Sequence, residues 1–169
     1  MKILIIGSCR NNDNESRIKK DRKLAEKIGK ELAKRGHEII TGGAGGLIGF
    51  LVNSYKKNNG KKWIIYYAIN EKKNKEAIPP ENIKADETIQ TNFNFALRDA
   101  FYIEKCDAVL ALSGKLLTFS EIIQAVKNYN KKVLQLNIGK NIKRIKDNLE
   151  LNSVFISSDI KKGINFLEK

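Results

Sequence analysis

The sequence has very few of the residues that build metal sites. Among its 169 residues there are only two cysteines, Cys9 and Cys106, and one histidine, His37. The cysteines lie far apart and neither has a partner at metal-binding spacing, so we expect no zinc site. His37 precedes an apolar run and is expected to be exposed, with no partner placed for a catalytic triad.

Long hydrophobic runs are also missing. No apolar stretch approaches the roughly 20 residues that a membrane-spanning helix needs, so we expect no membrane partner. The N-terminal run Met1–Gly7 is short and lacks a small-residue cleavage site, which favours a first strand over a signal peptide. We therefore expect a cytoplasmic protein. In that reducing compartment a structural disulfide is not expected.

Acidic residues are scarce relative to basic ones. Nineteen Asp and Glu stand against 32 Lys and Arg, for a net charge of +13. A charge of this size is compatible with a nucleic-acid partner. The excess is nearly all lysine, however, and it is spread through the chain without interleaved aromatic residues. Scattered lysine is usually a solvated surface, so we do not expect a nucleic-acid partner.

What the sequence does contain is a regular alternation of short apolar runs and amphipathic stretches. We predict strands over Lys2–Gly7, Glu38–Thr41, Trp63–Ile69, Ala108–Leu112, Lys132–Leu136 and Ser153–Ile156. We predict helices over Ser16–Arg35, Leu47–Lys57, Phe93–Lys105, Ser120–Tyr129, Ile142–Leu149 and Asp159–Leu167. Several strands are apolar at consecutive positions, which is typical of strands buried on both faces of a parallel sheet.

This order of elements predicts an α/β fold: an open, doubly wound parallel sheet of Rossmann-like type. We expect one nucleotide-binding domain over residues 1–169, a length that suits a sizeable core. The polar segment 70–91 contains both prolines and is predicted to be irregular. It is either a flap over a ligand or a surface loop, and the surface loop is the preferred interpretation.

A glycine-rich segment, Thr41–Gly49, runs from the end of a predicted strand into the start of a predicted helix. Glycines let backbone N–H groups approach an anion, and the helix N-terminus adds unpaired donors and a positive dipole end. The segment could also be a plain tight turn. The pattern favours a phosphate-bearing, nucleotide-like ligand, with candidate contacts from Gly42, Gly43, Gly45 and Gly46.

Two further loops are expected at the same edge of the sheet. Gly7-Ser8 follows the first predicted strand, and Ser113-Gly114-Lys115 follows the strand over Ala108–Leu112. Ligands in such sheets bind at the carboxyl ends of the strands, near the point where the strand order reverses. The three loops are therefore predicted to converge on one pocket.

Thr118 and Glu121 follow the third of these loops with the T-x-x-E spacing of a helix capping box. From spacing alone, a capping role is favoured. Alternatively, Glu121 points into the crevice and acts on a glycosidic carbon or on its attacking water. A Walker P-loop is excluded because Val109 and Leu116 occupy positions that require glycine and a hydroxyl residue.

Together, these motifs resemble the LOG family within the wider SLOG superfamily. They are the Gly-Ser first turn, T-G-G-x-x-G-L-I-G at 41–49, Arg98 nine residues before Asp107, and G-x-x-x-T-x-x-E at 114–121. The family's second motif reads P-G-G-x-G-T-x-x-E. Here Ser113, Lys115 and Leu117 depart from it.

The resemblance implies a phosphoribohydrolase that cleaves a nucleoside 5′-monophosphate into base and ribose 5-phosphate, with no metal or other cofactor. It implies that Arg98 orients the substrate and that Glu121 acts at the anomeric centre. Gly7, Ser8, Gly42, Gly43, Gly45, Gly46, Gly114, Lys115 and Thr118 would bind the nucleotide and its phosphate. A homodimer is implied, with the helix bearing the arginine near the interface.

Three alternatives stay open. Because the second motif is altered, the chain is alternatively a non-catalytic nucleotide or cofactor carrier, as molybdenum-cofactor carriers are on a similar fold. Nucleic-acid binding is a weaker alternative. Arg98 is alternatively a helix-surface ion-pair partner of Asp99 or Glu104.

Overall fold

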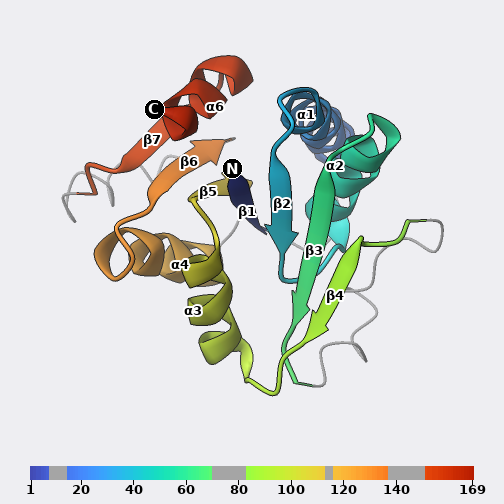
Figure 1. Cartoon of the computed structure of the whole chain (residues 1–169). Helices are drawn as coiled ribbons and strands as arrows, with labels where there is room; N and C mark the ends of the chain where they lie inside the picture. Colours follow the sequence, from blue (N-terminus) through green and yellow to red (C-terminus); the bar gives the residue numbers. More distant parts are fainter. Residues whose placement is uncertain (8–14, 70–82, 113–115, 137–150) are drawn as a thin grey trace.

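The computed structural model describes residues 1–7, 15–69, 83–112, 116–136 and 151–169 (Figure 1). Within these ranges the strands form one seven-stranded sheet in the order β4-β3-β2-β1-β5-β6-β7. Every strand pairs in parallel with its neighbours. The strands are β1 Lys2–Gly7, β2 Glu38–Thr41, β3 Lys62–Tyr67, β4 Glu87–Gln90, β5 Ala108–Leu112, β6 Lys132–Leu136 and β7 Val154–Ser157.

Helices cover both faces of the sheet, as the consecutive apolar positions of its strands require. On one face lie α1 Glu15–Lys34, α2 Gly46–Lys57 and α6 Ile160–Glu168, and on the other lie α3 Phe95–Lys105 and α4 Leu116–Lys127 (Figure 1). The predicted α/β fold with a parallel, Rossmann-like sheet is therefore confirmed.

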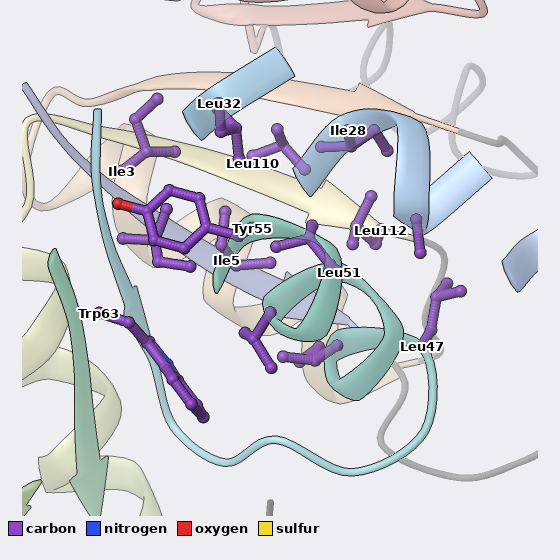
Figure 2. Close-up of a cluster of buried hydrophobic side chains, with 14 of the residues drawn as sticks. Ile3, Ile5, Ile28, Leu32, Leu47, Leu51, Tyr55, Trp63, Leu110 and Leu112 are labelled. Carbon is purple, nitrogen blue, oxygen red and sulfur yellow. The ribbon is translucent and has the colours of Figure 1, made fainter. Parts of the chain in front are cut away.

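Strand β1 shows how the sequence divides between the two cores. Its alternate residues Ile3 and Ile5 pack into the core beneath α1 and α2, while Leu4 and Ile6 pack into the core beneath α3 and α4. Figure 2 shows the first of these cores, where Tyr55 lies among isoleucines and leucines from the sheet and from both helices. Because successive strand residues point to opposite faces, each must be apolar.

The predicted irregular segment 70–91 is wrong over its last part. Strand β4 lies there, and its register pairs Ile64 with Glu87 and Tyr67 with Gln90. Because β4 is an edge strand, its residues are mostly exposed and polar. The sequence therefore has no apolar run there from which a strand could be predicted. Residues 70–82 of that segment, and the helix predicted over 142–149, lie outside the described residues.

Other boundaries shift by a few residues. Strand β3 ends at Tyr67 rather than at Ile69, and α4 begins at Leu116 rather than at Ser120. Of the two cysteines, the described one, Cys106, is buried, and burial raises the pKa of its thiol to about 11.

Candidate functional site at the carboxyl edge of the sheet

The carboxyl edge of the sheet contains the switch point of this fold. From β1 the chain proceeds outward through β2, β3 and β4, and it then returns to β5 on the other side of β1. At this point Gly7 ends β1 with a φ of 155° and lies beside Leu112. A Cβ on Gly7 would lie 2.2 Å from the carbonyl oxygen of Leu112, so only glycine fits here.

The glycine-rich turn leads from β2 into α2 at the same edge. Gly45 is the N-cap residue of α2, and no side chain caps the helix. By contrast, Asn94 accepts from the backbone N–H of Leu97 at the start of α3, and Asp159 does the same for Lys162 at α6. The first turn of α2 also has no acidic residue. Its N–H groups and dipole are therefore suited to an anion.

Arg98 lies on α3 and is held close to this turn by several hydrogen bonds. Its Nη1 donates to the carbonyl oxygens of Gly42, at 2.7 Å, and Tyr66, at 3.3 Å. Its Nε and Nη2 contact Oδ1 of Asp99 at 2.8 and 2.7 Å. The Arg98 side chain is only 7% exposed. Of the two ion-pair partners considered from the sequence, Asp99 is the one that the arginine contacts.

Aromatic rings lie against the guanidinium. Its Cζ is 5.2 Å from the ring centroid of Phe95 and 4.9 Å from that of Tyr102. These distances are typical of cation–π contacts, which fix the plane of an arginine as well as its position. The arginine is therefore held rigidly beside the glycine-rich turn.

Glu121 reaches the same cluster from α4. The hydroxyl of Tyr102 donates to Oε1 of Glu121. Burial, and then the charge of Asp99, raise the pKa of Glu121 to about 7, against the opposing effects of the Tyr102 hydrogen bond and of Arg98. The pKa of Tyr102 is raised well above its usual value, mainly by burial. Glu121 therefore changes its charge near neutral pH.

The favoured capping interpretation of Thr118 and Glu121 is wrong. Both residues lie inside α4, which begins at Leu116, and Thr118 is buried. The Glu121 carboxylate accepts from the side chain of Tyr102 rather than serving the helix terminus. The physical reason is that α4 starts earlier than its polar residues suggest.

The structure therefore brings Gly42, Arg98 and Glu121 into one connected cluster, linked through Tyr102. Sequence reasoning missed Tyr102. Its position one helical turn after Arg98 places both on the same face of α3, which is a signal that could have identified it. Three predicted contact residues, Ser8, Gly114 and Lys115, lie outside the described residues.

Leu117 stands where the LOG motif has glycine, and Leu116 precedes it at the start of α4. The side chains of Leu116 and Leu117 are 81% and 82% exposed, so neither is packed into the body of the protein. Leu117 therefore does not fill the space between the described strand ends.

Among the described residues, no group of three or more His, Cys, Asp or Glu side chains could hold a metal ion. The described helices include none with both the length and the apolar character that a membrane crossing requires.

Solved structures with the same fold include cofactor-binding proteins. The molybdenum cofactor binding protein of Rippkaea orientalis is 26% identical with a TM-score of 0.79, over 99% of this chain and 94% of that one. The Moco carrier protein of Chlamydomonas reinhardtii is 20% identical with a TM-score of 0.77, over 99% and 94%. DNA processing protein A of Helicobacter pylori, described as binding single-stranded DNA, is 20% identical with a TM-score of 0.63, over 99% and 80%.

No curated protein matches this sequence significantly. The model of the SLOG cluster4 family matches residues 1–164. This match confirms the SLOG part of the resemblance drawn from the motifs, whereas membership of the LOG family itself stays a prediction. The glycine turn, the parallel sheet and the family match agree: the chain belongs to the SLOG cluster4 family.

Proposed function

We propose that this protein binds and carries a phosphate-bearing, nucleotide-like cofactor without transforming it, and that the molybdenum cofactor is the first candidate. The observation that carries this proposal is that the N–H groups of Arg98 are used in bonds within the protein. Its N–H groups donate to Gly42, Tyr66 and Asp99, and two aromatic rings lie against it. An arginine that orients a substrate must direct its N–H groups at that substrate, whereas the N–H groups of Arg98 bond to other residues of the protein.

The residues at the edge fit the phosphate of such a cofactor. Gly45 and Gly46 are partly exposed at the uncapped N-terminus of α2, where backbone N–H groups and the helix dipole favour a negative charge. In this proposal the cofactor is held through its phosphate and organic parts. The 26% identity to the protein from Rippkaea orientalis supports this candidate.

A second candidate is the phosphoribohydrolase activity implied by the LOG resemblance. The raised pKa of Glu121, about 7, favours it, because a carboxyl group poised near neutral pH can act as a general acid or base. In this role Glu121 would act at the anomeric centre, and Arg98 would act indirectly by holding the wall of the site.

One experiment separates the two candidates. The purified protein is incubated with AMP and related nucleoside monophosphates, and ribose 5-phosphate is measured. Thermal unfolding is recorded with AMP, with inorganic phosphate and with the molybdenum cofactor. The carrier proposal expects a ligand-dependent rise in Tm, retained in Glu121→Ala, with no ribose 5-phosphate. Release of ribose 5-phosphate that disappears in Glu121→Ala would establish the hydrolase instead.

We also propose a homodimer formed through α3. Phe95 and Leu97 on this helix are 53% and 56% exposed, so the start of α3 presents large apolar side chains to the solvent. Burying them against a second copy would remove that surface from water. Sedimentation analysis of the wild type and of Leu97→Lys tests this: the wild type is expected to be dimeric, and the variant to shift toward the monomer.

A further inference from the structure

The solvent side of α1 has a composition unlike that of the other described helices. Every exposed residue of this helix from position 19 onward is a lysine or an arginine. The lysines among them are Lys19, Lys20, Lys23, Lys27, Lys30 and Lys34. An α-helix turns by about 100° per residue, so these six side chains fall within a sector about 100° wide along the helix axis. We call them the α1 lysine stripe.

Acidic neighbours do not neutralise the α1 lysine stripe. Glu26 pairs with Arg22 and Glu31 pairs with Arg35, each at 2.8 Å. Asp21 is buried and therefore lies away from the stripe. Within the described part of the chain, none of the six lysines takes part in an ion pair. The outer face of α1 therefore carries a row of positive charge that no ion pair of the described residues neutralises. Like charges one turn apart repel each other, so this row favours binding of an anion.

The opposite side of α1 packs into the core. Ile28 and Leu32 are fully buried in the core that α1 shares with α2 and the sheet, and α1 lies in the outer layer of the molecule (Figure 1). A helix that binds a membrane surface inserts its apolar face into the lipid. Here that face is not available, so the stripe can attract an anionic partner but cannot anchor in a bilayer.

The spacing of the stripe suits a linear polyanion. Lys19, Lys23 and Lys27 follow one another at intervals of about 6 Å along the axis, and the stripe extends over about 22 Å to Lys34. A nucleic-acid strand is a chain of regularly spaced phosphates, and lysines that neutralise them release bound counterions. Aromatic side chains, which stack on bases in single-strand binding proteins, are absent from the exposed positions of this face.

We propose that the α1 lysine stripe binds the phosphate backbone of nucleic acid, without reading its bases. This surface is formed by the outer face of α1 and is distinct from the cluster around Arg98. The lysines that looked scattered in the sequence therefore form an ordered surface, because the helical repeat aligns five of them at intervals of three or four residues. The interaction is expected to be electrostatic and strongly dependent on salt.

The test compares two quadruple variants that remove the same charge. In the first, Lys23, Lys27, Lys30 and Lys34 are changed to Gln. In the matched control, four exposed lysines on other segments, Lys57, Lys84, Lys127 and Lys161, are changed to Gln. Circular dichroism and thermal melts check that both variants fold. Binding of a fluorescein-labelled homothymidine strand is then measured by anisotropy between about 50 and 200 mM salt.

The stripe variant is expected to bind at least about tenfold more weakly than the control variant, with a salt slope shallower by about 3. Equal weakening in the two variants would overturn the proposal, because net charge alone would then explain binding. No binding by the wild type at the lowest salt would also overturn it. Stripe-dependent binding to phosphatidylserine vesicles or to polyglutamate, but not to the strand, would assign the surface to a different partner. None of these outcomes depends on the cofactor-carrier proposal.

Discussion

The guanidinium group of Arg98 occupies the space that a side chain at position 42 would fill. The two residues are 56 positions apart, and Nη1 of Arg98 donates to the carbonyl oxygen of Gly42 at 2.7 Å. A Cβ on Gly42 would lie 2.5 Å from Nη1 and 2.8 Å from Cζ of the arginine. A glycine is therefore needed at position 42 to leave room for the Arg98 guanidinium, whatever else the glycine-rich turn contacts.

Gly42→Ala is expected to destabilise the protein by about 1–3 kcal/mol, because the buried arginine must move. Urea denaturation measures this loss. The informative control is Arg98→Ala, which empties the space. In the double variant the alanine at position 42 should cost much less than it does alone. Simple additivity of the two losses would show that the contact does not constrain position 42.

Tyr102→Phe removes the hydroxyl that donates to Glu121. This hydrogen bond lowers the pKa of Glu121, so its loss should raise that pKa above its value of about 7. Carbon NMR of the glutamate carboxyl groups follows the titration directly. Tyr129→Phe is the matched control, since it changes a tyrosine beyond the end of α4 and should leave the Glu121 titration unchanged.

The charge of Glu121 should make the protein less stable as the pH rises. Its pKa is about 7 when folded and 4.5 in its ordinary state, so between these values the folded protein binds more protons than the unfolded one. The free energy of unfolding therefore falls as the pH increases through that window, by on the order of 1–3 kcal/mol after allowance for partial solvent access.

Glu121→Gln should remove this contribution while keeping an acceptor for Tyr102. Urea denaturation of both proteins between about pH 5 and pH 8 checks the expectation. The stability curve of the variant should be flatter in this window. If the two curves run parallel, the carboxyl group titrates at its ordinary value.

Gly45→Asp should separate helix capping from anion binding. Gly45 has an extended backbone, with φ −77° and ψ 166°, which aspartate adopts without strain at an N-cap. The variant should be as stable as the wild type or more stable by a few tenths of a kcal/mol. It should nevertheless lose the rise in Tm caused by phosphate or AMP, because its carboxylate takes the same N–H groups. A retained ligand effect would place the anion elsewhere.

His37 reports on the packing of the C-terminal helix. Contrary to the sequence-based expectation, it is buried, and its Nε2 lies 2.8 Å from Oε1 of Glu168, which also pairs with Arg35. Burial lowers the pKa of His37 below 6.5, and Glu168 partly opposes this effect. Glu168→Gln should therefore lower the pKa of His37 further.

Proton NMR measures this pKa without assignment, because the chain has one histidine. The lowered pKa of His37 determines how the free energy of unfolding changes with pH. The folded state binds fewer protons than the unfolded state, so the His37 contribution to stability is lost as the pH falls below about 6.5. A His37 titration that Glu168→Gln leaves unchanged would contradict the contact.

The sequence alone determined the architecture. Consecutive apolar residues in β1 and β5 can be buried only when helices cover both faces of the sheet, and the helical patterns between the strands supplied that cover. The same order placed the glycine-rich turn at the carboxyl edge. These features depend on local periodicity, which a linear sequence displays directly.

Only the tertiary structure decided how the individual residues are used. Strand β4 exists because β3 offers it an edge, and its own residues carry no apolar pattern. The seat of Arg98 on Gly42 and the contact of Tyr102 with Glu121 each join residues from different elements. The physical reason is that a side chain's partners, burial and pKa depend on groups distant in the sequence, and folding alone brings those groups together.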